Sequence, residues 1–219
     1  MPFHDRADAG RQLADKLQAY GGRADVVVLA LPRGGVPVAY EVAAVLRAPM
    51  DVLVVRRLTT FWNHELTIGA VAGGGTAVVD EDLCRALSLP PEAVHDIVKK
   101  EQTEVERRHQ FYRGVCGEAL ELRDRTVILV DDGMATGASM RAAVAAVAER
   151  RPAAIVVAVP VASYATCAAI AGKVREIVYL LIRDPVYSVG LWYETYSPVS
   201  DAEACEMLKR AHASGARRP

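Results

Sequence analysis

The chain has 219 residues, of which 52% are hydrophobic and 24% are charged, and it carries a formal net charge of −1. This length and apolar content are enough to bury the core of one domain, and a second domain is not required. Because the charge is near zero and the basic residues are scattered, the composition excludes the basic surface that nucleic acids or anionic membranes attract, so we expect a small-molecule partner.

The N-terminal part of the chain predicts an amphipathic helix. Asp5, a residue type favoured at the N-cap, is followed by apolar residues at helical spacing up to Leu17, and Gly21-Gly22 ends the pattern. The first ten residues contain no apolar stretch, and no uninterrupted apolar run in the chain reaches membrane-spanning length. We therefore expect a soluble, cytoplasmic protein with no membrane partner.

A continuous apolar run from Val26 to Leu31 predicts a parallel strand that helices cover on both faces. The letters Pro-Arg-Gly-Gly follow, ending at Gly35, and a helix is predicted from Val36 to Leu46. A loop between a strand and the next helix lies at the carboxyl edge of the sheet, where open α/β sheets bind ligands. Arg33 adds positive charge there, although a glycine turn with a solvated arginine remains the alternative.

The next predicted strand, Met50 to Val55, leads into a long insertion. Arg56 and Arg57 stand at its end and form either a surface pair or an anion contact. The following segment, 58–80, is rich in Thr and Gly and predicts an extension or hairpin with a mobile part, the usual location of a lid that excludes water. His64 in this segment is a candidate acid or base, but a lone histidine in a loop is more often solvated.

A long helix is predicted over about 91–112, and the most informative stretch of the chain comes after it. This stretch, residues 126–139, reads TVILVDDGMATGAS. Its apolar, β-branched run predicts a strand, which is followed by two adjacent carboxylates, Asp131 and Asp132. Small residues then lead into a helix predicted over 140–149.

The small residues after the two aspartates favour the binding of an anion. In such a loop, backbone N–H groups can approach an anion closely, and the helix that follows adds the positive end of its dipole. Asp131 and Asp132 would repel an anion. A ligand that suits both the small-residue loop and the acidic pair therefore carries hydroxyl donors or a bound cation as well as an anionic group. A phosphorylated sugar with a vicinal diol, together with Mg²⁺, meets these demands.

Three other interpretations of this stretch fail on spacing. A nucleoside-triphosphate loop needs a lysine after its second glycine, but Gly137 is followed by Ala138 and Ser139. The dinucleotide fingerprint G-x-G-x-x-G is absent from the stretch. A receiver-type phosphoacceptor needs further acids after the first strand, and this chain has Pro-Arg-Gly-Gly there. An Asp-Asp-Gly turn with a capping serine or threonine remains the plain structural alternative.

The rest of the chain completes an α/β pattern. Strands are predicted over 155–161 and 174–182, with a short helix between them that Ser163 caps. The order of elements makes an open parallel sheet flanked by helices. An aromatic-rich tail follows and precedes a helix predicted over about 201–211; its aromatic side chains either stack on a heterocyclic ligand or pack the tail onto the core.

The four cysteines give no sign of a disulfide framework or a zinc site. They are far apart, form no C-x-x-C pair and have no clustered histidines in the sequence. A reducing compartment suits them. They are Cys84, Cys116, Cys167 and Cys205.

The ten residues from Val130 to Ser139 resemble the signature of type I phosphoribosyltransferases, in which an apolar strand, two acids and a small-residue loop with Thr-Gly follow one another. The resemblance implies that Asp131 and Asp132 hold the ribose hydroxyls of phosphoribosyl pyrophosphate, and Mg²⁺ through the ligand or water, while the loop binds the 5-phosphate. It also implies that the loop at Arg33 holds the pyrophosphate, and in the family the peptide bond before this basic residue is often cis.

The resemblance further implies an enzyme that transfers the 5-phosphoribosyl group to a nitrogen acceptor and releases pyrophosphate in a Mg²⁺-dependent reaction. A nucleobase is the expected acceptor, and a homodimer is common among relatives. Ala135 stands where enzymes acting on 6-oxopurines place an aspartate, so the base and the general acid or base stay open. A regulator that binds phosphoribosyl pyrophosphate or a nucleotide without turnover is the alternative.

We expect one domain over 1–219, with a core over about 23–183, a mobile insertion over about 57–80, and a hood formed by the chain ends, about 1–22 and 184–219. The expected catalytic residues are Asp131, Asp132 and Arg33. The expected contacts to phosphoribosyl pyrophosphate are Arg33, Gly34, Gly35, Asp131, Asp132, Met134, Ala135, Thr136, Gly137, Ala138 and Ser139. Further candidates are Arg56 and Arg57 for the pyrophosphate, and Tyr187, Trp192 and Tyr193 for the base.

Overall fold

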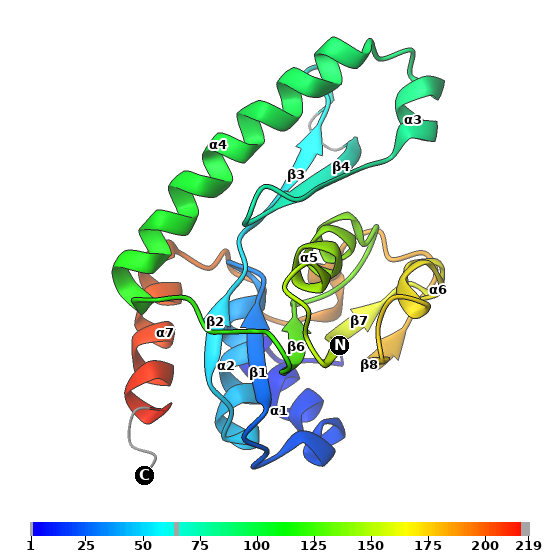
Figure 1. Cartoon of the computed structure of the whole chain (residues 1–219). Helices are drawn as coiled ribbons and strands as arrows, with labels where there is room; N and C mark the ends of the chain where they lie inside the picture. The colour runs from blue at the N-terminus through cyan, green and yellow to red at the C-terminus, as the bar shows by residue number, and fades with distance from the viewer. Residues whose placement is uncertain (1, 64–65, 216–219) are drawn as a thin grey trace.

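The computed structural model of the chain describes residues 2–63 and 66–215. Its main body is an open parallel sheet of five strands in the order β2-β1-β6-β7-β8, with helices on both faces (Figure 1). The prediction of an open parallel sheet flanked by helices is confirmed. The strands are β1 (Val26–Ala30), β2 (Met50–Val52), β6 (Thr126–Val130), β7 (Ala154–Ala162) and β8 (Glu176–Ile182).

The central pair of strands, β1 and β6, brings the two predicted loops together. These strands are parallel and in register, from Val26 opposite Thr126 to Ala30 opposite Val130. All five residues of each strand are buried, as the continuous apolar runs in the sequence predict. Because both strands end at the same level of the same edge, the loops after Ala30 and Val130 begin side by side.

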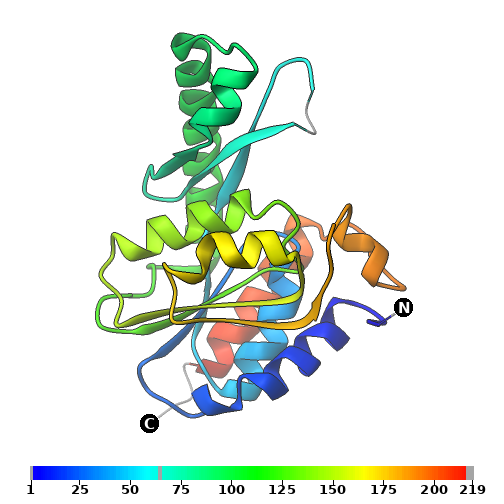
Figure 2. The same cartoon turned by 90° about the vertical axis from the view of Figure 1, so that its right-hand side faces the viewer.

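Helices cover the two faces of the sheet separately, and Figure 2 shows α5 and α6 on one face and α1, α2 and α7 on the other. In β1, Val28 packs with the second set of helices and Leu29 with the first, following the two-residue period of a strand. None of the described helices combines the length and apolar content needed to cross a bilayer. The helices are α1 (Arg6–Lys16), α2 (Gly35–Leu46), α5 (Ala138–Ala148), α6 (Tyr164–Ala171) and α7 (Asp201–Gly215).

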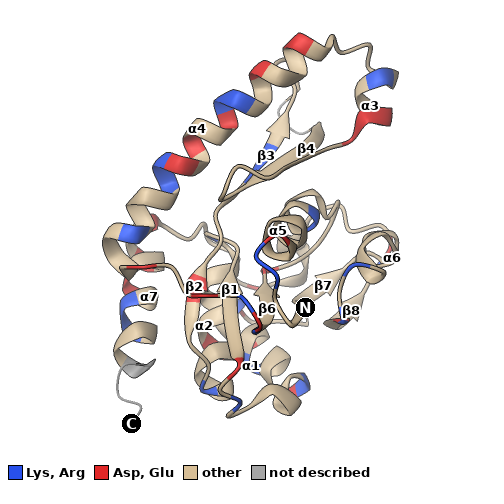
Figure 3. Ribbon diagram, in the orientation of Figure 1, with Lys and Arg blue, Asp and Glu red and all other residues tan. Residues whose placement is uncertain are grey.

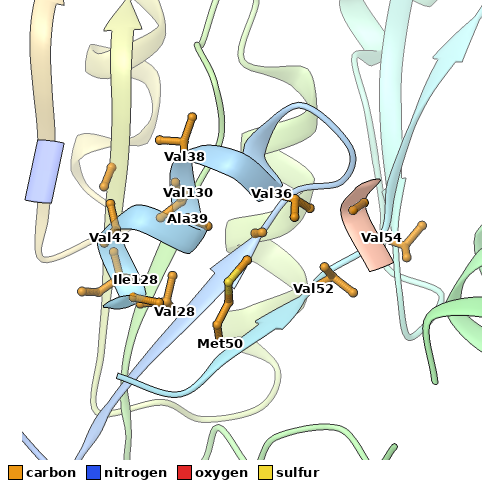
Figure 4. Close-up of a cluster of buried hydrophobic side chains, with 14 of the residues drawn as sticks. Val28, Val36, Val38, Ala39, Val42, Met50, Val52, Val54, Ile128 and Val130 are labelled. Carbon is orange, nitrogen blue, oxygen red and sulfur yellow. The ribbon is translucent and has the colours of Figure 1, made fainter. Parts of the chain in front are cut away.

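The interior between α2 and the sheet is built from aliphatic side chains. Figure 4 shows Val28 of β1 and Ile128 of β6 next to Val42 of α2, and all three side chains are fully buried. Burying a side chain of this size contributes about 1.5–3 kcal/mol to the stability of the fold. This packing fixes the position of α2, and therefore of the glycine loop at its start.

A second layer of structure, which we call the extension (residues 55–116), stands away from the main sheet (Figure 1). Its described residues form an antiparallel sheet in the order β3-β4-β5 and two helices. Charged residues of both signs alternate along the outer side of α4 (Figure 3), while Ile97, Val105 and Tyr112 are buried along its inner side. Its elements are β3 (Val55–Thr59), β4 (Thr67–Ala72), β5 (Ala77–Val79), α3 (Glu81–Ala86) and α4 (Pro91–Cys116).

The strand predicted from Met50 to Val55 is wrong in its second half. The parallel strand β2 ends at Val52, and the chain then passes into β3, which belongs to the antiparallel sheet. Arg56 and Arg57 therefore lie inside a strand of the extension and not at the end of a core strand. The apolar letters continue without a break across this junction, so hydrophobic pattern alone could not mark the change of sheet.

The two ends of the chain meet beside the sheet. Phe3 pairs in parallel with Tyr193, and its backbone N–H donates to the carbonyl oxygen of Trp192 at 3.3 Å. The N–H groups of Glu194 and Thr195 donate back to this N-terminal segment, each at 2.9 Å. The N-terminal segment and the tail after β8, both parts of the predicted hood, therefore lie side by side, and the short helix η2 (Val189–Trp192) lies in the tail.

Candidate functional site

A pocket of about 280 Å³ opens at the carboxyl edge of the main sheet, where β6 passes into α5. Residues 131–140, which form the loop after β6 and the start of α5, line this pocket. The extension contributes Arg57 to its wall, and the hood contributes Val189 and Tyr196. The pocket therefore lies where the core, the extension and the hood meet.

The loop from Gly133 to Ser139 has the geometry of an anion site. Gly137 has a φ of 69° at the N-cap of α5, and a Cβ atom built on it would lie 2.1 Å from Cγ2 of Thr166, so only glycine fits. Within the part of the chain that the structure describes, no acceptor bonds the backbone N–H groups of residues 135–139. These donors and the positive end of the α5 dipole favour a phosphate in the pocket.

The loop is held from behind by the end of β7 and the start of α6. The Met134 N–H donates to the carbonyl oxygen of Val161 at 2.8 Å. The hydroxyls of Ser163 and Thr166 both donate to the carbonyl oxygen of Ala135, at 3.2 and 2.7 Å. Ser163 also caps α6, as the sequence predicts, by accepting from the Thr166 N–H at 3.1 Å. The carbonyl group of Ala135 is thus engaged by α6 and its N-cap.

The glycine loop after β1 packs directly against the two acids. A Cβ atom on Gly34 would lie 2.2 Å from Oδ2 of Asp132, and one on Gly35 would lie 2.7 Å from the carbonyl oxygen of Val130. The peptide bond between Pro32 and Arg33 is cis, as the family resemblance led us to expect. The missing side chains of the glycines are therefore what allows this loop to approach the acidic pair.

The side chain of Arg33 points along the edge of the sheet toward α7. Its Nε atom lies 4.0 Å from Oδ1 of Asp201, and the side chain is 40% exposed. It is not among the described residues that line the pocket. Of the two glycine amides beside it, the Gly35 N–H already donates to the carbonyl oxygen of Leu31 at 3.0 Å, whereas no described acceptor bonds the Gly34 N–H.

The two carboxylates at the end of β6 differ in environment. The Asp132 N–H donates to Oδ1 of Asp131 at 2.9 Å. Oδ2 of Asp132 accepts from Nε of Arg6 at 2.8 Å and from the Tyr196 hydroxyl at 2.9 Å. Burial, and next the neighbouring Asp132 carboxylate, raise the pKa of Asp131 well above its ordinary range, although Arg6 and Arg57 oppose this shift. A bound cation would relieve the repulsion between the two acids.

The two arginines of β3 separate because successive side chains of a strand point to opposite sides. Arg57 lines the pocket, where its charge acts on Asp131. Nε of Arg56 instead donates to a carboxylate oxygen of Glu101 on α4 at 2.8 Å. His64, the candidate acid or base of this region, lies outside the described residues.

The three aromatic candidates of the tail lie in different surroundings. Tyr187 is 87% exposed. The ring of Trp192 lies under the guanidinium of Arg183, 5.2 Å from the ring centre, and packs near Phe3. Tyr193 is buried and donates its hydroxyl hydrogen to the carbonyl oxygen of Asp132 at 2.6 Å. Tyr193 is therefore the one of these three that contacts the acidic pair directly.

Sequence reasoning missed three residues that the structure brings to the site, namely Arg6, Val189 and Tyr196. Tyr196 belongs to the aromatic-rich tail, so composition pointed to its neighbourhood but not to this residue. Arg6 comes from the first helix, 126 residues before its partner Asp132. No spacing in the sequence signals such a contact.

A second group of polar side chains lies around β2, and none of its members lines the pocket. Side-chain atoms of Asp51, Cys116 and His212 lie within 4.8 Å of one another. The guanidinium of Arg113 binds both oxygens of Asp51, and Nε2 of His212 lies 2.9 Å from the carbonyl oxygen of Met50, to which it donates. The ion pair with Arg113 accounts for the buried carboxylate, and we assign no function to this group.

Comparison with known proteins identifies the family. Residues 3–180 match the model of the phosphoribosyl transferase domain. Over 211 residues, 96% of its length, the chain is 42% identical to "Putative phosphoribosyl transferase Rv0571c" of Mycobacterium tuberculosis H37Rv and to its counterpart MT0597 of strain CDC 1551. The chain spans about half the length, 47%, of these relatives.

A solved structure matches the fold of this chain. The crystal structure of TT1426 from Thermus thermophilus matches with a TM-score of 0.79 and 37% sequence identity, covering 96% of this chain and 99% of that one. The family model and the Mycobacterium relatives confirm the resemblance of the Val130 to Ser139 stretch to the family signature. The chain belongs to the phosphoribosyl transferase domain family.

Proposed function

We propose that the protein is a phosphoribosyltransferase that moves the 5-phosphoribosyl group from phosphoribosyl pyrophosphate to a nitrogen atom of a nucleobase. The observation that carries this proposal is the pocket in which the N–H groups of 135–139, which bond to no acceptor among the described residues, lie together with the carboxylates of Asp131 and Asp132. The amides suit the 5-phosphate, and the carboxylates suit the ribose diol. Family membership supports the same donor.

The acids also fit Mg²⁺, which prefers carboxylate oxygens and retains several water molecules. Asp131 and Asp132 both line the pocket, and partial burial together with the second carboxyl beside it raises the pKa of Asp131. We propose that these two residues hold the ion through the ligand or through water. When bound, Mg²⁺ would neutralise charge on the pyrophosphate and make it a better leaving group.

In the proposed reaction, the bond between the anomeric carbon and the pyrophosphate oxygen breaks, and the pyrophosphate takes the electron pair. A lone pair of the acceptor nitrogen forms the new bond to carbon, and a proton leaves that nitrogen. Positive charge that develops on the sugar is stabilised by the carboxylates of Asp131 and Asp132. The Gly34 N–H, Arg33 and Arg57 are the proposed contacts for the pyrophosphate.

One observation favours a second candidate function, a regulator that binds the same donor without turnover. Ala135 has no side chain that could take the proton from the acceptor, and its carbonyl oxygen is occupied by Ser163 and Thr166. The catalytic proposal therefore needs an acceptor that loses its proton to solvent or to another base. Under either proposal we expect a cytoplasmic homodimer, by analogy with relatives.

The test is a calorimetric titration with phosphoribosyl pyrophosphate, with and without Mg²⁺, followed by an assay of pyrophosphate release across a panel of nucleobases. Mg²⁺-dependent binding and release with one base would support the transferase, and Asp131→Asn should then abolish release. Binding without release by any base would favour the regulator. Absence of binding would contradict both functions.

A further inference from the structure

Arg6 begins the first helix, yet its guanidinium reaches the acidic pair of the pocket. Its Nε donates to Oδ2 of Asp132 at 2.8 Å, and its Nη1 donates to the carbonyl oxygen of Ser197 at 2.8 Å. The guanidinium carbon lies 3.8 Å from the centre of the Tyr196 ring. The side chains of Arg6 and Asp132 are each 11% exposed, so the pair is shielded from water and fixed in geometry.

The contacts of Asp132 are divided unequally between its two carboxylate oxygens. Arg6 and the Tyr196 hydroxyl both donate to Oδ2 of Asp132. The Tyr193 hydroxyl donates to the backbone carbonyl oxygen of Asp132. Among the described residues, no donor bonds Oδ1. A carboxylate oxygen accepts about two hydrogen bonds, so Oδ2 is satisfied and Oδ1 retains its capacity to accept.

We propose that Arg6 is a positioning residue for the ribose of the ligand. By holding Oδ2 together with Tyr196, it fixes the rotamer of Asp132 and leaves Oδ1 to accept from a ribose hydroxyl. This inference rests on the proposed function and assigns to the N-terminal helix a role in ligand recognition. Loss of Arg6 should therefore weaken binding of the sugar only, because the loop proposed to bind the 5-phosphate is held from the opposite side by Ser163 and Thr166.

A purely structural role for Arg6 makes a different prediction. In that case Arg6 would only tie the first helix to the tail through Ser197, and its loss would weaken all parts of the site in proportion to the loss of stability. Stability measurements alone cannot separate the two roles, because removing one member of a shielded ion pair destabilises a protein in either case. Two measurements therefore decide between the roles. One asks whether the effects of Arg6→Ala and Asp132→Asn on affinity are coupled, and the other asks whether Arg6→Ala weakens binding of the sugar but not of phosphate.

The experiment measures the affinity for phosphoribosyl pyrophosphate with Mg²⁺ by calorimetry for Arg6→Ala, Asp132→Asn and the double variant. We expect Arg6→Ala to bind about 10 to 100 times more weakly, the scale of loss that follows misplacement of a binding group. In the double variant, affinity should equal that of Asp132→Asn alone, because both changes remove the same interaction. Arg6→Lys should recover only part of the affinity, since an ammonium lacks the planar fork that serves two acceptors.

Selectivity is measured with inorganic phosphate, by the rise in unfolding temperature that it produces. We expect this rise to be unchanged in Arg6→Ala. The matched control is Arg11→Ala on the same helix, where the arginine is 56% exposed and lies 3.7 Å from Glu41; it should behave as wild type in both measurements. If Arg6→Ala does not fold, Tyr196→Phe removes the other donor to Oδ2 and should weaken sugar binding about threefold to tenfold, the scale of one hydrogen bond.

Additive losses in the double variant, or a smaller phosphate response that parallels the weaker sugar binding, would overturn the inference and leave Arg6 a structural residue. Unchanged affinity in both Arg6→Ala and Tyr196→Phe would overturn it as well. Failure of the wild-type protein to bind phosphoribosyl pyrophosphate would refute the proposed function itself, and the inference with it. The wild-type titration thus separates the two kinds of failure.

Discussion

At the scale of single residues, the neighbours Asp131 and Asp132 show how identical side chains acquire different properties. Successive residues at a strand end point in different directions. Asp132 therefore receives Arg6 and Tyr196 from the hood, whereas in the described part of the chain Asp131 accepts from the Asp132 N–H. The result is a carboxyl with a raised pKa beside one that is held in an ion pair.

Asp131→Asn should stabilise the folded protein at neutral and alkaline pH. A carboxyl whose pKa is raised on folding favours the folded state below its unfolded pKa of about 3.9, and this contribution is lost as pH rises through the folded pKa. We expect the variant to gain about 1 kcal/mol at pH 8, the usual scale when a strained functional residue is neutralised. The gain should disappear near pH 4.

Thermal unfolding of wild type and Asp131→Asn at pH 4 and pH 8 measures this effect. Asp15→Asn, at an exposed position of the first helix, is the control and should leave the unfolding temperature unchanged at both pH values. A destabilised Asp131→Asn at pH 8 would show that the charged carboxylate is well accommodated in the folded protein.

At the scale of elements, α5 links the pocket to the extension. Its first turn follows the anion loop, and its side carries Ala142 and Ala146, which pack against Ala70 and Ala72 of β4. All four alanines are buried, so the strand and the helix approach closely along this seam. The extension is thus anchored on the helix that begins at the pocket.

Enlarging the seam should destabilise this contact. Ala146→Leu adds three carbon atoms at a position that is 2% exposed, and overpacking of this kind costs about 1–3 kcal/mol. Denaturant unfolding of the purified variant measures the cost. Ala148→Leu, two residues further along the same helix at an exposed position, is the control and should stay within about 0.5 kcal/mol of wild type. Equal costs for the two variants would mean that the seam is not tightly packed.

At the scale of the whole molecule, the two chain ends and the pocket form one connected structure. Phe3 is buried against Tyr193, with ring centres 5.3 Å apart, and Tyr193 lies 5.1 Å from Tyr196. Tyr193 and Tyr196 both donate to Asp132. A change at the N-terminus is therefore transmitted to the acidic pair through packed aromatic rings.

Phe3→Ala tests this connection. Loss of a buried phenylalanine costs about 3–5 kcal/mol, and the loosened tyrosines should hold Asp132 less firmly. We expect a lower unfolding temperature and a smaller rise in that temperature on adding phosphoribosyl pyrophosphate, since stabilisation by a ligand follows its affinity. Phe61→Ala, at a position 58% exposed, is the control for stability. A full ligand-induced rise in Phe3→Ala would show that the N-terminus is not coupled to the pocket.

The sequence by itself determined the sheet and the loops at its edge. Continuous apolar runs predict β1, β6 and β7 because strands covered on both faces need apolar residues at every position. The acids and small residues that follow β6 are local features; they identified the family, and they predict the anion loop. Such signals depend on neighbours along the chain, so they are readable without the fold.

The tertiary structure alone decided which distant side chains complete the pocket. Arg6, Val189 and Tyr196 reach it because the chain ends pack together across the edge of the sheet. It also decided that Arg57 and not Arg56 faces the acids. The sequence could not predict this, because the apolar residues run on into β3 and do not mark its start at Val55. These outcomes depend on how elements pack, and no local pattern in the sequence encodes a contact between its first helix and a loop 126 residues later.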